Sequence, residues 1–171
     1  MPTKAIAAHA SAAYILQKYP KRETKAGLKE KYQKAAFTDK LVCFALTEPG
    51  VGTDASNVQT VAVKDGDDYI LNGTKMFITT AGHAEWYIII AVTDRSKGNN
   101  GMTAFIVHKD APGFSVGKHE KKMGIRGSAT CELILKNVRV NKNDILGKEG
   151  QGLKMALASL DSGRMGIATQ A

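Results

Sequence analysis

Short apolar runs separated by turn residues fill the middle of the chain, and they predict a β-domain. The runs are four to eight residues long and rich in β-branched and aromatic side chains, which favour strands. Between Leu41 and Leu135 they read LVCFAL, TVAV, DYIL, TKMFIT, EWYIIIAV, MTAFIV, GFSV and TCELIL. Because turn residues separate the runs, we expect neighbouring runs to pair as antiparallel strands.

Three dipeptides predict where this β-domain turns. Asp65-Gly66 and Asn72-Gly73 supply the positive φ angles that tight hairpin turns require, so residues 60–79 are predicted to form a meander. Pro112-Gly113 marks a further turn.

Helical patterns flank the β-rich centre. Residues 5–19 are rich in alanine and end before Pro20, and a second short helix is predicted to begin at Thr24. After residue 147, Leu153, Leu157 and Leu160 recur at helical spacing, so we expect them to share one apolar face. The pattern reaches residue 171 without a capping residue, which is typical of a helix that continues in a longer protein.

Taken together, these patterns divide the chain into three parts. We expect residues 1–38 to form a partial N-terminal helical segment, residues 39–148 a central β-domain, and residues 149–171 the start of a C-terminal helical domain. The 171 residues, 43% of them hydrophobic, are enough for one buried core and too few for two large domains.

Charge narrows the class of protein without selecting a function. The 24 Lys and Arg residues exceed the 16 Asp and Glu residues, for a formal net charge of +8, which suits nucleic acid, a phosphorylated small molecule or simple solubility. The basic runs lack interleaved aromatic residues, so no nucleic-acid partner is predicted. Since the chain also lacks a membrane span and a signal peptide, we expect a soluble protein.

The cysteines and histidines predict no metal site. Cys43 and Cys131 each lie in an apolar run, and we expect two buried, reduced thiols. The four histidines show no ligand spacing with each other or with the cysteines; they are His9, His83, His108 and His119.

Residues 43–56, CFALTEPGVGTDAS, hold the first candidate for chemistry. An apolar run ends there in Thr-Glu-Pro and continues into a loop with two glycines. The backbone N–H groups of Gly50, Val51 and Gly52, with the hydroxyl of Thr53, suit a phosphate cradle. On spacing alone, a plain turn that closes a hairpin is the alternative. The stretch matches neither the dinucleotide-binding glycine motif nor a P-loop.

Two further clusters are weaker when each is taken alone. Phe77 and Thr79 are two residues apart, so on a strand they share one face, which suits a planar ring and its heteroatoms; core packing by Phe77 is the alternative. Asp161 and Arg164 are three residues apart in LDSGR, where a surface ion pair is the alternative to a substrate site.

In their order along the chain, these segments resemble the acyl-CoA dehydrogenase family of flavoenzymes. The family signature is similar to ALTEPGVGTD at residues 45–54. Similar segments follow downstream, namely NGTKMFIT, PGFSVGKHEKKMGIRGSAT, GKEGQGLKMAL and LDSGRMGIA. The resemblance covers roughly residues 41–171 and is greatest to the short-chain, butyryl-CoA branch. Val51 and Asn57 depart from the pattern, because the family usually carries a small residue or Asn at the first position and a small residue at the second.

The resemblance implies a fold that is mainly β with flanking α, an antiparallel β-barrel or sandwich middle domain with short helical stubs at both ends. It implies FAD as cofactor, contacted by Phe44, Ala45, Leu46, Thr47, Glu48, Pro49, Gly50, Val51, Gly52, Thr53, Phe77, Ile78 and Thr79. It implies an acyl-CoA substrate, contacted by Thr53, Ser96, Asp161, Ser162, Gly163 and Arg164. Arg164 is expected to face the β-domain.

The reaction implied is the α,β-dehydrogenation of a short-chain acyl-CoA, with electron-transfer flavoprotein as electron acceptor and a homotetrameric parent enzyme. The family's catalytic base is a glutamate of the C-terminal helical domain, and no residue of this chain matches it, so the isolated chain is expected to be inactive. The compartment would be the cytoplasm in a bacterium and the mitochondrial matrix in a eukaryote. A non-catalytic binding or scaffold module and a related flavoenzyme similar to acyl-CoA oxidase are the alternatives.

Overall fold

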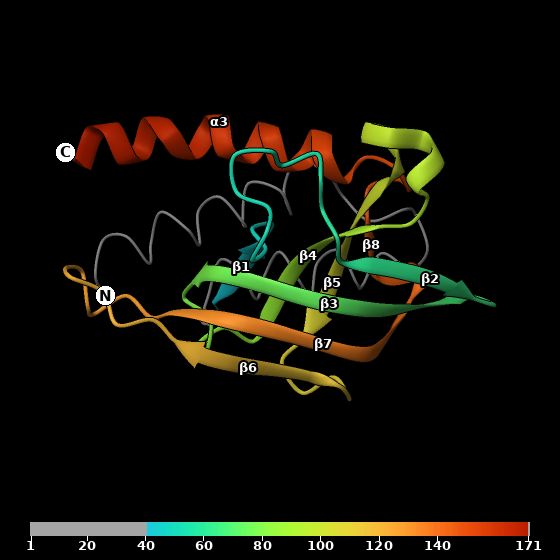
Figure 1. Cartoon of the computed structure of the whole chain (residues 1–171), viewed down its shortest axis with the longest axis horizontal. Coiled ribbons are helices and arrows are strands. Elements are labelled where there is room, and N and C mark those ends of the chain that lie inside the picture. Colours follow the sequence, from blue (N-terminus) through green and yellow to red (C-terminus); the bar gives the residue numbers. More distant parts are fainter. Residues whose placement is uncertain (1–40, 171) are drawn as a thin grey trace.

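In the computed structural model of the chain, the structure describes residues 41–170, which form an eight-stranded mixed sheet and a long C-terminal helix (Figure 1). The helices predicted within residues 1–38 lie outside the described residues. The sheet order is β6-β7-β3-β2-β4-β5-β8, and β1 pairs with β4 outside this path. The elements are β1 (Val42–Ala45), β2 (Val61–Asp65), β3 (Asp68–Thr79), β4 (Trp86–Val92), η1 (Arg95–Gly101), β5 (Met102–His108), β6 (Phe114–His119), β7 (Thr130–Asn141), η2 (Lys142–Asp144), β8 (Ile145–Leu146) and α3 (Gly152–Gln170).

The expected fold class, mainly β with a flanking helix, is confirmed, but the pairing of two strands differs from the prediction. Most neighbours are antiparallel, whereas β1 and β2 each run parallel to β4. The β2–β3 hairpin separates β1 from β4 along the chain, so β4 can enter the sheet beside β1 in the same direction. An apolar run has no direction of its own, and the antiparallel expectation was therefore wrong for these two pairs.

Two of the three predicted turns are confirmed. Asp65 pairs with Asp68 across the β2–β3 hairpin, where Gly66 has a φ of 61°. Gly113, with a φ of 83°, turns the chain between β5 and β6. The predicted turn at Asn72-Gly73 is wrong, because both residues lie inside the twelve-residue strand β3.

Gly73 forms part of a β-bulge and allows Thr60 to approach the backbone closely; it does not form a turn. The register between β3 and β7 shifts between Leu71 and Gly73, and Gly73 has a φ of 153°. A Cβ atom on Gly73 would lie 2.4 Å from Oγ1 and 2.8 Å from Cα of Thr60. Only glycine fits this crossing of two chain segments.

Gly73→Ala is therefore expected to lower the free energy of unfolding by about 2 kcal/mol or more, because it adds a steric overlap to backbone strain. Gly66→Ala is the matched control, since Gly66 has a positive φ but open space around its Cβ direction, and it should cost about 1 kcal/mol. Urea unfolding of both variants measures the difference. Equal destabilisation would show that the contact with Thr60 relaxes freely.

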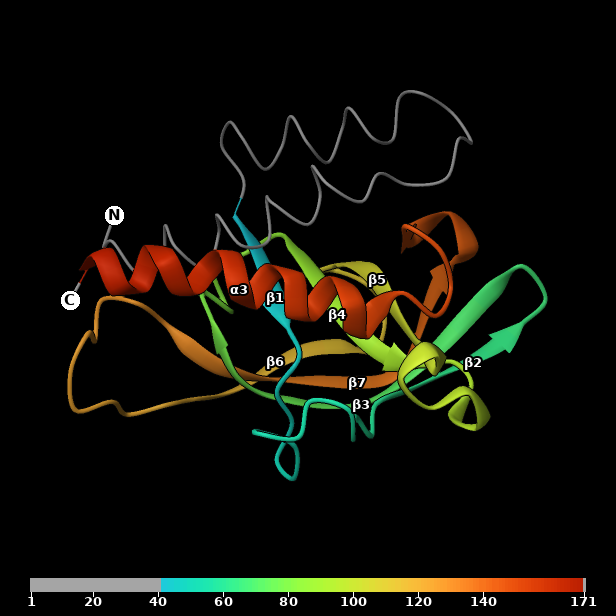
Figure 2. The same cartoon turned by 90° about the horizontal axis from the view of Figure 1, so that it is seen from above.

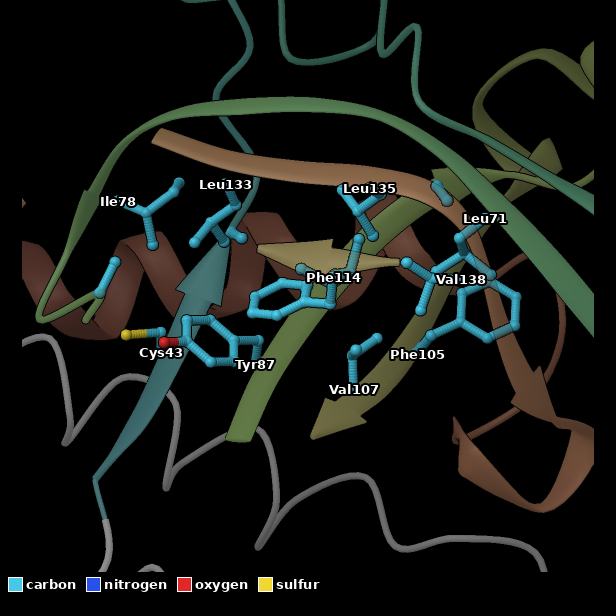
Figure 3. Packing of buried hydrophobic residues seen from close by; sticks show 14 of the residues in the cluster. Cys43, Leu71, Ile78, Tyr87, Phe105, Val107, Phe114, Leu133, Leu135 and Val138 are labelled. Carbon is cyan, nitrogen blue, oxygen red and sulfur yellow. The ribbon is translucent and has the colours of Figure 1, made fainter. Parts of the chain in front are cut away.

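The core lies on both sides of β4, which explains its uninterrupted apolar sequence. Tyr87 and Ile89 face one cluster, which packs β1, β4 and β5 against β3, β6 and β7. Figure 3 shows this cluster, with Leu133 and Leu135 opposite Tyr87 and Phe105. Ile88 and Ile90 face a second cluster, which the first half of α3 covers. Strands buried on both faces read as continuous hydrophobic runs.

The two cysteines are buried and free, as the sequence predicts. The Cys43 thiol donates to the carbonyl oxygen of Thr79 at 3.0 Å, and the Cys131 thiol donates to that of Ala81 at 3.4 Å. Burial raises the pKa of both thiols, so they remain protonated at neutral pH.

The predicted apolar face of the C-terminal helix is only partly buried. Leu153 packs into the second cluster together with Met155 and Ala156, but Leu157 is 48% exposed and Leu160 is 37% exposed. The end of α3 and the loop between β6 and β7 lie at the same end of the molecule (Figure 2). The core thus covers only the start of this apolar face, and the face continues, partly exposed, along α3.

Candidate functional site

A cavity of about 1030 Å³ lies between the second half of α3, the segments around β1 and the end of β3, and the β6–β7 loop. Many of the predicted site residues line it. They are Phe44, Leu46, Thr47, Gly52, Thr53, Phe77, Ile78, Thr79, Gly163 and Arg164. The tertiary structure thus brings the three sequence clusters, which are far apart along the chain, to one place.

Other predicted residues lie away from this lining. Ala45, Glu48 and Val51 are buried, and Pro49 and Gly50 are exposed on the outside of a turn. Ser96 lies in η1, where its hydroxyl donates to Asp94 at 2.7 Å. Asp161 is exposed on α3, and the side chain of Ser162 is not among those described.

The sequence interpretation missed part of the lining, namely Ala55, Lys122, Gly124, Ile125, Ser128, Thr130, Leu157, Ser159, Leu160 and Ala168. Residues 122–130 are Lys122 followed by MGIRGSAT, and they lie within a segment that carries the family resemblance. That resemblance was the signal that could have identified them as site residues. Leu157 and Leu160 carried the signal of helical spacing, from which only a shared apolar face was predicted.

A tight turn follows β1. The backbone N–H groups and carbonyls of Glu48 and Val51 bond reciprocally at 3.1 Å, so the N–H group of Val51 is already paired within the turn. Val51 is buried, which explains how a larger residue fits there. Gly52 follows on the cavity lining, and a Cβ atom there would meet nothing within 4 Å. Nothing in the described part of the protein requires glycine at this position, so the space suits a bound group that approaches the backbone closely.

Phe77 is presented to the cavity by a bulge in β3. The register with β7 shifts between Lys75 and Ile78, and Phe77 takes a φ of 57°. Its side chain is 57% exposed on the cavity wall, so the core-packing alternative is wrong. A bulky residue in the left-handed region is strained, and such strain is concentrated at binding sites.

A buried ion pair, absent from the predicted site chemistry, joins the turn to β3. Nζ of Lys75 lies 2.7 Å from Oε1 of Glu48, with 0% and 3% of the two side chains exposed. The Glu48 carboxylate also accepts from the backbone N–H groups of Gln59 at 2.6 Å and Thr60 at 3.0 Å, and Lys75 donates to the carbonyl of Leu46 at 3.2 Å. Glu48 thus links the turn after β1 to β3 and to residues 59–60, beneath the residues that line the cavity.

Electrostatics keeps this pair charged at neutral pH. Burial by itself would raise the pKa of Glu48. The charge of Lys75, its hydrogen bond and the hydrogen bonds from Thr60 and Gln59 instead hold that pKa below its usual range. Burial lowers the pKa of Lys75 to about 8, and the carboxylate of Glu48 opposes that fall.

The wall that carries Phe77 and Thr79 continues into a loop that Lys122 closes upon itself. Its ammonium group donates to the carbonyls of Ile125 at 2.9 Å and Ser128 at 2.5 Å. Ile125 has a φ of 51°, a strained value for a β-branched residue. Thr130 is the register partner of Thr79, so two hydroxyl side chains from adjacent strands lie on the same wall.

Arg164 brings a fixed positive charge to the helical wall. It lines the cavity, as expected of a residue that faces the β-domain, yet it is exposed in this chain. Among the described side chains, Arg164 and Asp161 form no ion pair with each other, so the surface-pair alternative is not what the structure contains.

The lining suits a flat aromatic group with a polar, anionic extension. Phe44, Phe77 and the exposed leucines of α3 offer apolar surface, while the threonine hydroxyls and Arg164 offer hydrogen bonds. Within residues 41–170, no group of three or more His, Cys, Asp and Glu residues is arranged to bind a metal. No helix in this described part combines the length and the apolar character that crossing a bilayer requires.

Comparison with known proteins shows which family this architecture resembles. Residues 43–138 match the family model described as acyl-CoA dehydrogenase, middle domain. A short-chain specific acyl-CoA dehydrogenase of Megasphaera elsdenii is 54% identical over 133 residues, and the human mitochondrial short-chain specific enzyme is 50% identical over 133 residues. The solved structure of butyryl-CoA dehydrogenase from Megasphaera elsdenii superposes with a TM-score of 0.91 at 46% identity, over 97% of this chain and 43% of that one.

The chain spans about a third of these curated relatives, since the matches cover 77% and 78% of this chain but 35% and 32% of the two enzymes. The family model covers more than half of the chain, and the structural match extends over nearly all of it. The chain therefore belongs to the acyl-CoA dehydrogenase family, and its β-domain is the middle domain of that family.

Proposed function

We propose that this chain supplies the cofactor- and substrate-binding middle domain of a parent enzyme that dehydrogenates short-chain acyl-CoA thioesters at the α,β position with FAD. The observation that carries the proposal is the convergence on one cavity of Thr47, Phe77 and Thr79 from the β-domain with Arg164 from α3. Relatives named short-chain specific acyl-CoA dehydrogenases support the substrate class.

The residues present fit FAD. The hydroxyls of Thr47 and Thr79 and the exposed face of Phe77 suit the edge and the plane of a flavin ring, and the open space at Gly52 beside Thr53 suits its pyrophosphate. When bound, FAD supplies the acceptor for the β-hydride of the substrate. The chain's own contribution is to orient the ring, to stabilise the negative charge that develops on it and to exclude water.

Arg164 and Gly163 on the lining support a thioester site beside the flavin site, with Thr53 serving both. Asp161, Ser162 and Ser96 are proposed as contacts to more distant parts of the acyl-CoA. None of the described lining residues carries a carboxylate, so the base that removes the α-proton must come from elsewhere in the parent enzyme. The isolated chain should accordingly show no turnover.

Electron-transfer flavoprotein is the proposed electron acceptor and a homotetramer the proposed assembly of the parent enzyme. Both belong to the family pattern that the chain's sequence resembles. The bacterial and mitochondrial relatives support a cytoplasmic location in a bacterium or a matrix location in a eukaryote.

The parent enzyme containing this chain is expected to purify with the yellow absorbance of bound flavin, and anaerobic butyryl-CoA should bleach it. The chain alone should retain flavin weakly and give no dye reduction with butyryl-CoA. A colourless parent enzyme that takes up no added FAD would overturn the proposal. Turnover by the chain alone would show that the chain itself carries the base that removes the α-proton.

A non-catalytic binding module is the second candidate, favoured by the absence of a carboxylate among the described lining residues. The same measurements separate the two functions, because a binding module takes up flavin or acyl-CoA without bleaching. Oxygen consumption in place of dye reduction would indicate an activity similar to that of acyl-CoA oxidase.

A further inference from the structure

Ser128 is a buried polar side chain on the cavity wall whose hydroxyl lacks a hydrogen-bond partner. The residue is 3% exposed, and its Oγ atom has no partner among the described residues. A buried hydroxyl without a partner costs free energy, and native proteins retain few of them. Because Ser128 lies on a cavity wall, a molecule bound in the cavity can supply the missing hydrogen-bond partner.

The position of Ser128 shows which part of an occupant it would meet. The backbone N–H of Thr80 donates to the carbonyl of Ala129 at 2.7 Å, and Thr130 pairs with Thr79 in the β3–β7 ladder. The start of β7 and the residues just before it thus continue the wall that carries Phe77 and Thr79. An occupant that lies against Thr79 also lies near Ser128.

Unfavourable features are concentrated in this wall. The hydroxyl of Thr80 is also buried without a partner, and Thr80 has a φ of 68°. Phe77 and Ile125, on the two sides of the same wall, also have positive φ angles. Strain and unpaired polar groups that persist together are typical of a surface organised around a ligand.

We propose that Ser128 is a further flavin-contacting residue, whose hydroxyl donates a hydrogen bond to an acceptor atom at the edge of the bound ring. The inference rests on the proposed function, because it takes the occupant of this wall to be the flavin. The carbonyl oxygens and ring nitrogens of a flavin edge are acceptors that a hydroxyl can reach, and a serine hydroxyl turns about a single side-chain torsion. Lys122, which bonds to the Ser128 carbonyl, holds the backbone while the hydroxyl turns.

Ser128→Ala in the full-length parent enzyme tests this, with Thr60→Val as the matched control. Thr60 is 1% exposed and also carries a buried hydroxyl, but it is not on the cavity lining. Removing the Ser128 hydroxyl should raise the urea midpoint of the flavin-free protein, because that hydroxyl is unpaired there. Only Ser128→Ala should raise the Kd for FAD, by about 10-fold, because only that variant loses a bond to the ligand. Ser128→Cys, which keeps a weaker donor, should fall between.

The readouts are FAD titration of the flavin-free protein by fluorescence and urea unfolding without FAD. An unchanged Kd in both Ser128 variants would overturn the inference, and so would a lower urea midpoint for Ser128→Ala, because the hydroxyl would then have a partner such as water in the free protein. If the wild-type parent enzyme itself bound no FAD, the proposed function would fail and the inference with it. The wild-type titration distinguishes that outcome from a failure of the inference alone.

Discussion

Replacing Lys75 with methionine is expected to lower the free energy of unfolding by about 3 to 5 kcal/mol. Methionine fills a similar volume, so the loss is electrostatic and not a cavity. Without the ammonium group, the Glu48 carboxylate remains buried with only the N–H groups of Gln59 and Thr60 to stabilise it. Urea unfolding at neutral pH, where both groups of the wild-type pair are charged, measures the effect.

The double variant Lys75→Met/Glu48→Gln should recover part of this loss, because no charge remains buried and the glutamine oxygen can still accept from one of the two backbone N–H groups, which donate to different oxygens of Glu48. It also remains informative if the single variant does not fold. Arg139→Ala is the control, since Arg139 pairs with Asp65 and Asp68 at the surface and its loss should change little. A single variant as stable as the Arg139 control would show that Lys75 does not stabilise the turn.

Replacing Arg164 with lysine in the full-length parent enzyme is expected to lower turnover about 100-fold with the fold intact. Lysine keeps the positive charge on the cavity wall but loses the planar fork of donors, and two lost charge-assisted hydrogen bonds amount to roughly 3 kcal/mol. That loss corresponds to about two orders of magnitude in rate. Stopped-flow reduction of the bound flavin by butyryl-CoA measures the chemical step directly.

Lys154→Arg is the control for Arg164, because Lys154 is an exposed cation on the same helix and is not on the cavity lining. It should leave the rate of flavin reduction unchanged. A wild-type rate of flavin reduction in Arg164→Lys would show that Arg164 is an ordinary surface charge with no role in the reaction. A lower melting temperature in that variant would indicate a role in packing.

Local chemistry along the chain was enough to predict most elements. The apolar runs, the Asp65-Gly66 hairpin and the helix after residue 147 all appear where the pattern predicts them. The family resemblance at residues 45–54 and 72–79 likewise indicated Thr47, Phe77 and Thr79, which meet on the cavity. Such signals are readable because strand propensity, turn geometry and helical spacing depend on residues that are close in the sequence.

The errors arose where a residue responds to a distant partner. Asn72-Gly73 has the composition of a hairpin turn, but the approach of Thr60 and pairing with β7 place it inside β3. Leu157 and Leu160 have the spacing of a packing face, but the cavity separates that part of α3 from β1 and the end of β3, so they line the cavity and stay partly exposed.

The sequence by itself determined the family, the kinds of elements and many of the cavity residues. Only the tertiary structure decided the parallel pairing at β4, the bulge that presents Phe77, the contribution of residues 122–130 and the role of Glu48. The physical reason is the same in each case. Glu48 and Lys75 are 27 positions apart, and neither carries a local sign of the other. Their pairing is set by burial in a shared interior, where a charge is stable only beside its partner.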